Sequence, residues 1–303
     1  MLQEDSDLWF QDGTIIIVAG ETKFRLHPGV LSRHSEVFKD MFNVPQPPEA
    51  QADPTMEYID NCPAVRVSES AEDMALLLSA MYDPGCSIYL MEHPMTCSVA
   101  STLLRLSAKY EVPRVHATVS KRFPLTFPES IEKLPLEPFL LKSPLVLDGH
   151  SLFQAIRLMH EYDMKLALPA AFYYAAQLSY EKMLNGILDQ SWRASDMQKC
   201  LEVREILLKA DYQLYEPIFD HTFTFEGGCG NREECEASIR EQMLNYGGVY
   251  GDIRSLVQFP AWLDHLRQHT GICNDCSVSL NHHCEATRYS IWADIGRVSI
   301  RGV

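Results

Sequence analysis

The feature that most restricts the fold is a run of five β-branched residues, TIIIV, at positions 14–18. Such residues favour a strand, because their stiff side chains pack well on a pleated surface. Neighbouring side chains in a strand point to opposite faces, so an uninterrupted apolar run must be covered on both faces. The run therefore predicts a strand in the interior of a sheet.

Turn-forming residues flank this strand. Asp12-Gly13 precedes it, and Gly20-Glu21-Thr22 follows it as a short turn. Residues 23–26 alternate like the second strand of a hairpin. Pro28 suits the first turn of a helix, where its missing N–H costs nothing. Residues 30–42 carry a wide apolar arc, which predicts one helix buried on two sides.

The following residues complete an α+β domain that we expect to end near residue 125. Residues 43–64 contain five prolines and no periodicity, which predicts a long Pro-rich loop. A short strand at 65–67 precedes a helix that Ser70 can cap, with apolar residues at helical spacing up to Met81. A helix pair is expected within 98–123.

Beyond this domain the pattern becomes helical. Prolines recur through residues 126–149, which we interpret as a connector. Apolar residues then recur at helical spacing in 151–161, 169–184 and 198–211, so residues 150–303 are predicted to form a mainly helical C-terminal domain. Two domains also suit a chain of 303 residues, at roughly 100–200 residues per domain.

Charge argues against nucleic acid as a partner. The chain has 26 Lys and Arg against 41 Asp and Glu, a net charge of −15. Residues 1–83 hold 5 basic and 15 acidic side chains, so two thirds of the surplus lies there. Phosphate binding needs a basic surplus, and no long segment has one. The acidic N-terminal domain is instead expected to favour a basic or mixed-charge protein partner.

Compartment follows from two further patterns. The first residues, MLQEDSDLWF, are acidic and lack the basic start and apolar core of a signal peptide. No apolar run reaches the 18 or so residues of a membrane span. We therefore expect a soluble protein of the cytoplasm, the nucleus or both, with no membrane partner, in which the nine cysteines are thiols or metal ligands.

One set of residues carries a resemblance to a known family. An Asp-Gly turn leads to a strand ending F-x-L-H, and the helix after it carries V-L, S-x-x-F and M-F. The residues in question are Asp12, Phe24, Leu26, His27, Val30, Leu31, Ser35, Phe38 and Phe42. Residues 8–125 thereby resemble the BTB/POZ domain, a small sheet with helical hairpins. The surrounding sequence is similar to that of the large family of fungal, basidiomycete-type BTB proteins. A weaker similarity extends into the tail, at Cys273, Cys276, Arg288 and Trp292.

The resemblance implies an interaction scaffold. BTB domains pair with themselves, with cullin-type ubiquitin ligase subunits, or with transcriptional co-regulators. Only about eight residues precede the first strand signal, which is too few for the extra helix and exchanged strand of many BTB dimers. The function hypothesis is a non-catalytic adaptor that binds a protein partner. The resemblance implies two forms of it, a homodimer and an adaptor of a ubiquitin ligase. The alternative is a nuclear transcriptional regulator with a zinc-stapled C-terminal region.

Catalysis is not expected. The chain contains no GxSxG, HExxH, Walker A or protein-kinase motif set. His27 at a strand–helix junction can hydrogen-bond backbone groups. Ser35 can bond back to a carbonyl, which explains it without a nucleophile. We therefore predict no catalytic residue and no cofactor other than a structural metal ion.

The hypothesis of a metal ion rests on the cysteines of the C-terminal region. His282 and His283 lie in the same region of the sequence. The candidate ligands are Cys229, Cys235, Cys273 and Cys276, of which the last two form a C-x-x-C pair. Four such ligands suit tetrahedral zinc. Packing is the alternative, because Cys235 shares a predicted helix face with Ile239 and Met243, and Cys276 shares one with Leu280, Cys284, Thr287 and Ile291. A redox or disulfide role is the third possibility.

Overall fold

A computed structural model gives the fold of the chain. It describes residues 2–43, 57–82, 93–134, 143–147, 149–188, 193–219, 228–245, 256, 264, 268 and 271–302. The chain forms two compact units. The first, the sheet unit, comprises Met1–Phe123 and Pro144–Val146; the second, the helical unit, comprises Pro124–Ser143 and Leu147–Val303.

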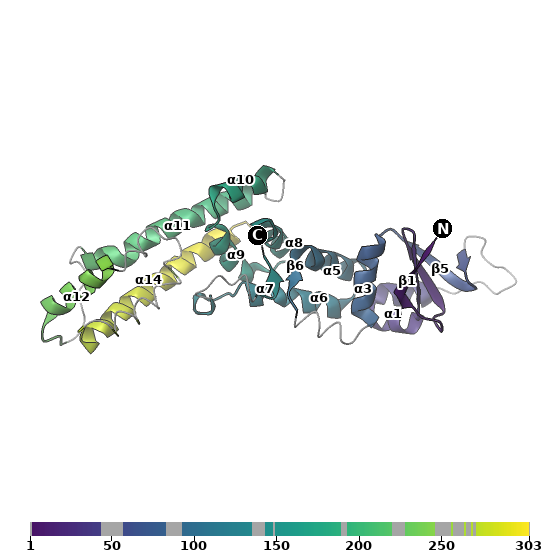
Figure 1. The fold of residues 1–303 in the computed structure, drawn as a ribbon, viewed down its shortest axis with the longest axis horizontal. Helices are drawn as coiled ribbons and strands as arrows, with labels where there is room; N and C mark the ends of the chain where they lie inside the picture. The colour runs from purple at the N-terminus through teal and green to yellow at the C-terminus, as the bar shows by residue number, and fades with distance from the viewer. Residues whose placement is uncertain are drawn as a thin grey trace. The chain divides into compact units, whose positions relative to one another are not determined.

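The sheet unit holds most of the strands and the first helices (Figure 1). In chain order they are β1 (Gln3–Trp9), β2 (Ile15–Ala19), β3 (Thr22–Leu26), α1 (Pro28–His34), α2 (Glu36–Asn43), β4 (Glu57–Ile59), β5 (Cys62–Val67), α3 (Ala71–Tyr82), β6 (Met95–Thr96), α5 (Cys97–Lys109), α6 (Pro113–Ser120) and β7 (Leu145–Val146). Helix α7 (Arg122–Thr126) spans the division between the units.

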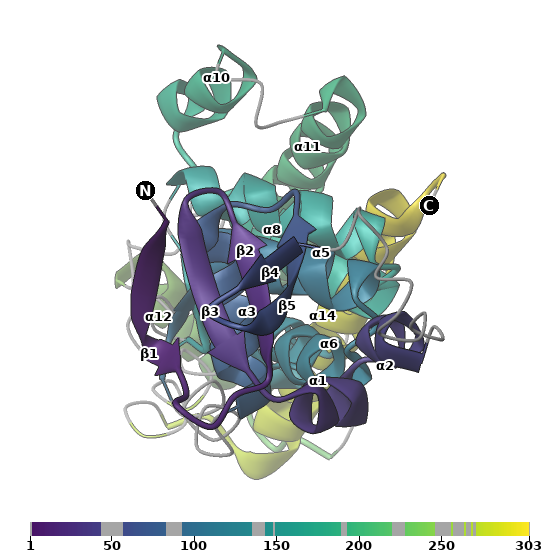
Figure 2. The ribbon, with the colours of Figure 1, turned by 90° about the vertical axis from the view of Figure 1, so that its right-hand side faces the viewer.

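Five of these strands form one mixed sheet in the order β1-β3-β2-β5-β4 (Figure 2). Strand β2 pairs antiparallel with β3 and parallel with β5, so it is the central strand. Every residue of β2 is buried, as the apolar run predicts. On one face Ile16 and Val18 pack with Cys62 and the half-buried Trp9. Helix α3, which contacts β2, buries its apolar stripe, including Leu77.

Tight turns set the register of the sheet. Gly20 joins β2 to β3 with a φ of 57°, a left-handed conformation that glycine adopts at little cost. Gly13 is required for a different reason, because a Cβ there would lie 2.9 Å from the backbone of Leu26. Asp60 and Asn61 join β4 to β5 with φ of 49° and 60°. This two-residue turn suits a hairpin, and Asp and Asn tolerate it best after glycine.

The β4–β5 hairpin corrects the prediction of a loop over residues 43–64. Residues 57–59 form β4, and β5 begins at Cys62 instead of Val65. Residues 44–56, the rest of that loop, lie outside the described residues. Strand β1 was also not predicted, because its sequence is acidic and its exposed residues break the apolar alternation.

The single helix predicted over residues 30–42 is wrong, because Ser35 interrupts it. Ser35 is extended, with φ −138° and ψ 121°, and it ends α1 before α2 begins. Its side chain accepts a hydrogen bond from the N–H of Phe38 at 3.1 Å, so Ser35 caps α2. The same hydroxyl donates to the carbonyl oxygen of Tyr110, 75 residues away, and not back to a carbonyl of its own helix as expected.

Tyr110 lies at the centre of this junction, directly after α5. Its ring stacks on Phe38, with centroids 5.1 Å apart and planes at 12°. Its hydroxyl donates to Glu69 at 2.6 Å, and Lys109 pairs with the same carboxylate. Burial, together with the hydrogen bond to Glu69, raises the pKa of Tyr110 well above its usual value. The hydroxyl therefore remains a proton donor throughout the physiological range.

The helical unit contains η2 (Ile131–Lys133), α8 (Gly149–Glu161), η4 (Lys165–Ala167), α9 (Leu168–Ala175), α10 (Tyr180–Leu188), α11 (Ala194–Phe219), α12 (Arg232–Asn245) and α14 (Asn274–Ile300). The long helices α11 and α14 run side by side, and α9 packs against both (Figure 1). Their contact buries apolar residues such as Val203 and Ile295. Among the described residues, no helix is long and apolar enough to cross a membrane.

Two predictions for this part of the chain are corrected. The helix expected over 169–184 is two helices, α9 and α10, separated by residues 176–179. The connector expected over 126–149 contains η2 and β7, and β7 pairs with β6 in the sheet unit. The side chain of Trp292 on α14 donates to the carbonyl of Glu129, which also ties this stretch to the helical unit.

We predict that Ser35→Ala lowers the free energy of unfolding of the sheet unit by about 2–3 kcal/mol, because it removes both a helix cap and a buried hydrogen bond. Ser70→Ala is the matched control: Ser70 caps α3 from an exposed position and should cost about 0.5–1 kcal/mol. Urea unfolding followed by hydrogen exchange of sheet-unit peptides measures both. Equal losses would contradict the role assigned to the Tyr110 contact.

Candidate metal centre and interaction surface

The residues of the predicted signature are mainly core. Phe24, Leu26, Leu31 and Phe38 are fully buried, and Ser35 is buried beside them. Val30 and Phe42 are half-buried on α1 and α2. These side chains fix how α1 and α2 pack in the sheet unit.

Asp12 and His27 form a polar contact at the edge of that core. Nε2 of His27 lies 3.2 Å from Oδ1 of Asp12, and the backbone N–H of His27 donates to the hydroxyl of Tyr82 at 2.6 Å. The rings of Phe10, His27 and Tyr82 form one aromatic cluster. The hydrogen bond from His27 lowers the pKa of the exposed Asp12 carboxyl. The contact thus joins the turn before β2 to the end of α3.

An acidic surface lies at the β1 edge of the sheet. The acidic sheet edge, as we name it, consists of Glu4, Asp5, Asp7 and Glu21, and Lys23 joins it to Asp60 in the β4–β5 turn. These residues are adjacent, because the N–H of Gln3 donates to the carbonyl of Glu21, and Lys23 bridges Glu4 and Asp60. Sequence reasoning located the acidic surplus in residues 1–83 but not this edge, because β1 itself was not predicted.

Lys23 does not neutralise this edge. Its ammonium group lies 2.7 Å from Asp60, 3.3 Å from Glu4 and 4.7 Å from the ring centre of Trp9. The side chain is only 11% exposed, whereas those of Glu4 and Asp60 are about half exposed. The hydrogen bond to Asp60 raises the pKa of Lys23, so the ammonium stays charged. Lys23 is therefore already paired with two carboxylates, and Asp7 and Glu21 remain exposed.

The acidic sheet edge presents carboxylate side chains to a partner more than it presents free backbone N–H and C=O groups. The side chain of Asp5 accepts hydrogen bonds from the N–H groups of Asp7 and Leu8, at 3.0 and 2.9 Å. The pairing of β1 with β3 is also irregular between Glu4 and Trp9. Charges and irregular pairing are common protections of an edge strand against non-specific strand addition. A partner of this surface is expected to contact its side chains.

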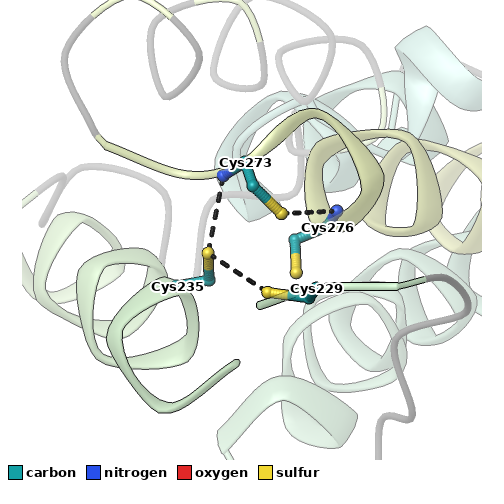
Figure 3. Close-up of side chains that lie close together, drawn as sticks. All are labelled: Cys229, Cys235, Cys273 and Cys276. Carbon is teal, nitrogen blue, oxygen red and sulfur yellow. Dashed lines mark hydrogen bonds between the residues drawn. The ribbon is translucent and has the colours of Figure 1, made fainter. Parts of the chain in front are cut away.

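The helical unit brings together all four cysteines predicted as zinc ligands (Figure 3). Cys229 lies just before α12, and Cys235 lies in the first turn of α12. Cys273 is the N-cap of α14, and Cys276 lies in its first turn. Their sulfur atoms all lie within 4.8 Å of one another, from three separate stretches of chain. Residues 235 and 273 are far apart in sequence, so spacing alone could not establish this convergence.

Backbone N–H groups point at two of the sulfurs. The N–H of Cys276 donates to Sγ of Cys273, and the N–H of Cys273 donates to Sγ of Cys235, each at 3.4 Å. The first of these bonds is the main cause that lowers the pKa of Cys273 to about 7. Burial raises the pKa of Cys276. Chemically, the cluster is a closed set of four soft ligands that can hold one tetrahedral metal ion.

The other predicted members of this region do not join the cluster. Cys284 is buried on the same face of α14 as Cys276 and Leu280, which agrees with the packing interpretation for that residue. His282 and His283 lie near it along α14, and among the described residues the convergent group contains only the four cysteines. The packing interpretation therefore fits Cys284, and the metal hypothesis concerns the four converging cysteines alone.

Sequence reasoning missed one polar cavity in the helical unit. Its volume is about 400 Å³, and its lining includes His160, Asp196 and Lys199. Nε2 of His160 lies 3.1 Å from Asp196, and Lys199 donates to the carbonyl of Ser299. No periodicity links these residues, since they come from α8, α11 and the end of α14. Nε2 of His160 and the ammonium group of Lys199 thus already contact protein groups.

Comparison with known proteins identifies the first of the two units. A model of the BTB/POZ domain matches residues 9–124. This part of the chain is a BTB/POZ domain, as its signature residues predict, and BTB/POZ domains are protein–protein interaction modules. No curated protein and no solved structure matches the chain. The five-stranded sheet, with α1, α2, α3, α5 and α6, is the fold of this domain here.

We predict that His27→Phe raises the pKa of Asp12 toward its ordinary value, because phenylalanine keeps the ring contacts with Phe10 and Tyr82 but cannot donate to the carboxyl. A pH titration of the Asp12 carboxyl carbon by NMR measures this directly. Asp7, another exposed carboxyl, serves as the internal reference and should titrate unchanged. An unchanged Asp12 titration would show that His27 does not hold this carboxyl.

Proposed function

We propose that the protein is a non-catalytic adaptor whose BTB domain binds a protein partner. The observation that carries the proposal is the BTB/POZ domain itself, and the carboxylates of the acidic sheet edge beside it support the choice of partner. The polar signature residues support a structural role, because Ser35 is buried with its hydroxyl engaged by Phe38 and Tyr110. His27 likewise contacts Asp12 and Tyr82.

The partner that the acidic sheet edge suits is a protein with a basic surface. Asp7 and Glu21 are exposed, and the neighbouring Lys23 is already bonded to Glu4 and Asp60. Complementary charge accelerates association and selects among partners. The helical unit, in this proposal, fixes or selects the bound partner. A cullin-type ubiquitin ligase subunit is the first partner class to test, because the BTB resemblance implies it.

We predict that the double reversal D7K/E21K weakens partner capture by the full-length chain about 3–10-fold, since each exposed charge contributes on the order of 0.5 kcal/mol. Capture by the unmodified chain should also fall as salt rises from 0.1 to 1 M, because the Debye length shrinks from about 10 to 3 Å. Quantitative mass spectrometry of proteins retained on the immobilised chain measures both effects.

The matched control is E161K/E181K, which makes the same charge change at exposed positions of the helical unit. It should leave capture unchanged. Capture that resists both salt and D7K/E21K would contradict the acidic sheet edge as the binding surface. Light scattering of the purified chain distinguishes self-association from binding to another protein. A monomer that retains no partner at low salt would contradict the adaptor role.

A further inference from the structure

We propose that Cys229, Cys235, Cys273 and Cys276 bind one structural Zn²⁺ ion that fastens α12 to the start of α14. The proposal is independent of the adaptor role, because metal content and partner capture are measured separately. It concerns the helical unit, whereas the acidic sheet edge belongs to the BTB domain.

Distances support the metal. A zinc ion with four sulfur ligands at about 2.3 Å places those sulfurs about 3.8 Å apart at the corners of a tetrahedron. The sulfurs of Cys229 and Cys235 are 3.8 Å apart, and all four lie within 4.8 Å of one another. Figure 3 shows the four side chains converging on one point from α12, α14 and the segment before α12. Small adjustments would complete the tetrahedron.

The choice of zinc follows from the ligands. Four thiolates favour zinc or iron over calcium and magnesium, which prefer oxygen. A site with four protein ligands has no open position for substrate, so it is structural. On binding, each of the four thiols that is still protonated releases its proton to solvent, and four Zn–S bonds form without any change in oxidation state.

The surroundings suit the negative charge of a zinc–thiolate site. Two sulfurs accept backbone N–H bonds, and Cys273 and Cys276 lie at the positive end of the 27-residue helix α14. The net charge of zinc with four thiolates is −2, which these donors and the helix dipole help to compensate. A cluster that served packing alone would gain nothing from four sulfurs facing one another.

Helix α12 has little apolar packing of its own, so a metal ion would stabilise its position. Among the α12 side chains that the structure describes, only Cys235 and Ile239 are buried. Short helices depend on tertiary packing for most of their stability, and two small buried contacts supply little of it. One zinc ion would link α12 to a residue 38 positions further along the chain, and closing a long loop in this way restricts the unfolded state.

The experiment measures metal in the purified full-length protein by inductively coupled plasma mass spectrometry. We expect one equivalent of zinc per chain, and none after denaturation with a chelator. Refolding with Co²⁺ alone should give the intense visible bands of a tetrahedral thiolate site. The absence of zinc together with no cobalt spectrum would overturn the proposal, as would a mononuclear iron or a disulfide between any of the four cysteines.

Variants make the assignment specific. Replacement of the two least buried ligands, C229S/C273S, should lower zinc affinity by more than about 100-fold, since even changes outside the ligand shell cost about 10–100-fold. Cys284→Ala is the matched control: Cys284 is buried on the same helix, outside the cluster, and its loss should leave the zinc content at one equivalent. Zinc retained by the double serine variant would overturn the assignment even if both variants fold.

Discussion

The BTB domain of this protein depends on the contact between Ser35 and Tyr110. Ser35 stops one helix and starts the next, and its hydroxyl reaches the residue that ends α5. The hydroxyl of Tyr110 in turn donates a hydrogen bond to Glu69, which lies just before α3. Four helices, α1, α2, α3 and α5, are therefore held by buried hydrogen bonds that meet at Tyr110. Buried polar groups that are fully paired specify a unique arrangement, because any other packing would leave them unpaired.

How much of the fold could be predicted depended on which physical signal dominated locally. The run at 14–18 predicted the central strand, because only a strand covered on both faces accommodates it. Strand β1 was not predictable from periodicity, since its exposed residues are acidic and its pairing with β3 is irregular. The break at Ser35 escaped prediction for a related reason: the apolar arc continues across it, and the bond that stabilises it comes from Tyr110, 75 residues away.

The same distinction applies to the cysteines. The C-x-x-C spacing of Cys273 and Cys276 indicated half of a metal site, but only the fold could bring Cys229 and Cys235 to it. The packing interpretation fits Cys284, which lies in the interior of α14 and away from the other thiols. The two units thus differ in what stabilises them. The BTB domain has an apolar sheet and a polar junction. Helix α12 in the helical unit has only a few buried residues around the clustered thiols among those described.

We propose that the BTB domain binds the partner and that the helical unit has a supporting role. The most direct test is lysine-directed cross-linking mass spectrometry on the full-length chain with its captured partner. We expect partner cross-links at Lys39 and Lys121, two exposed lysines of the BTB domain. Partner cross-links confined to Lys182 and Lys209 of the helical unit would contradict it.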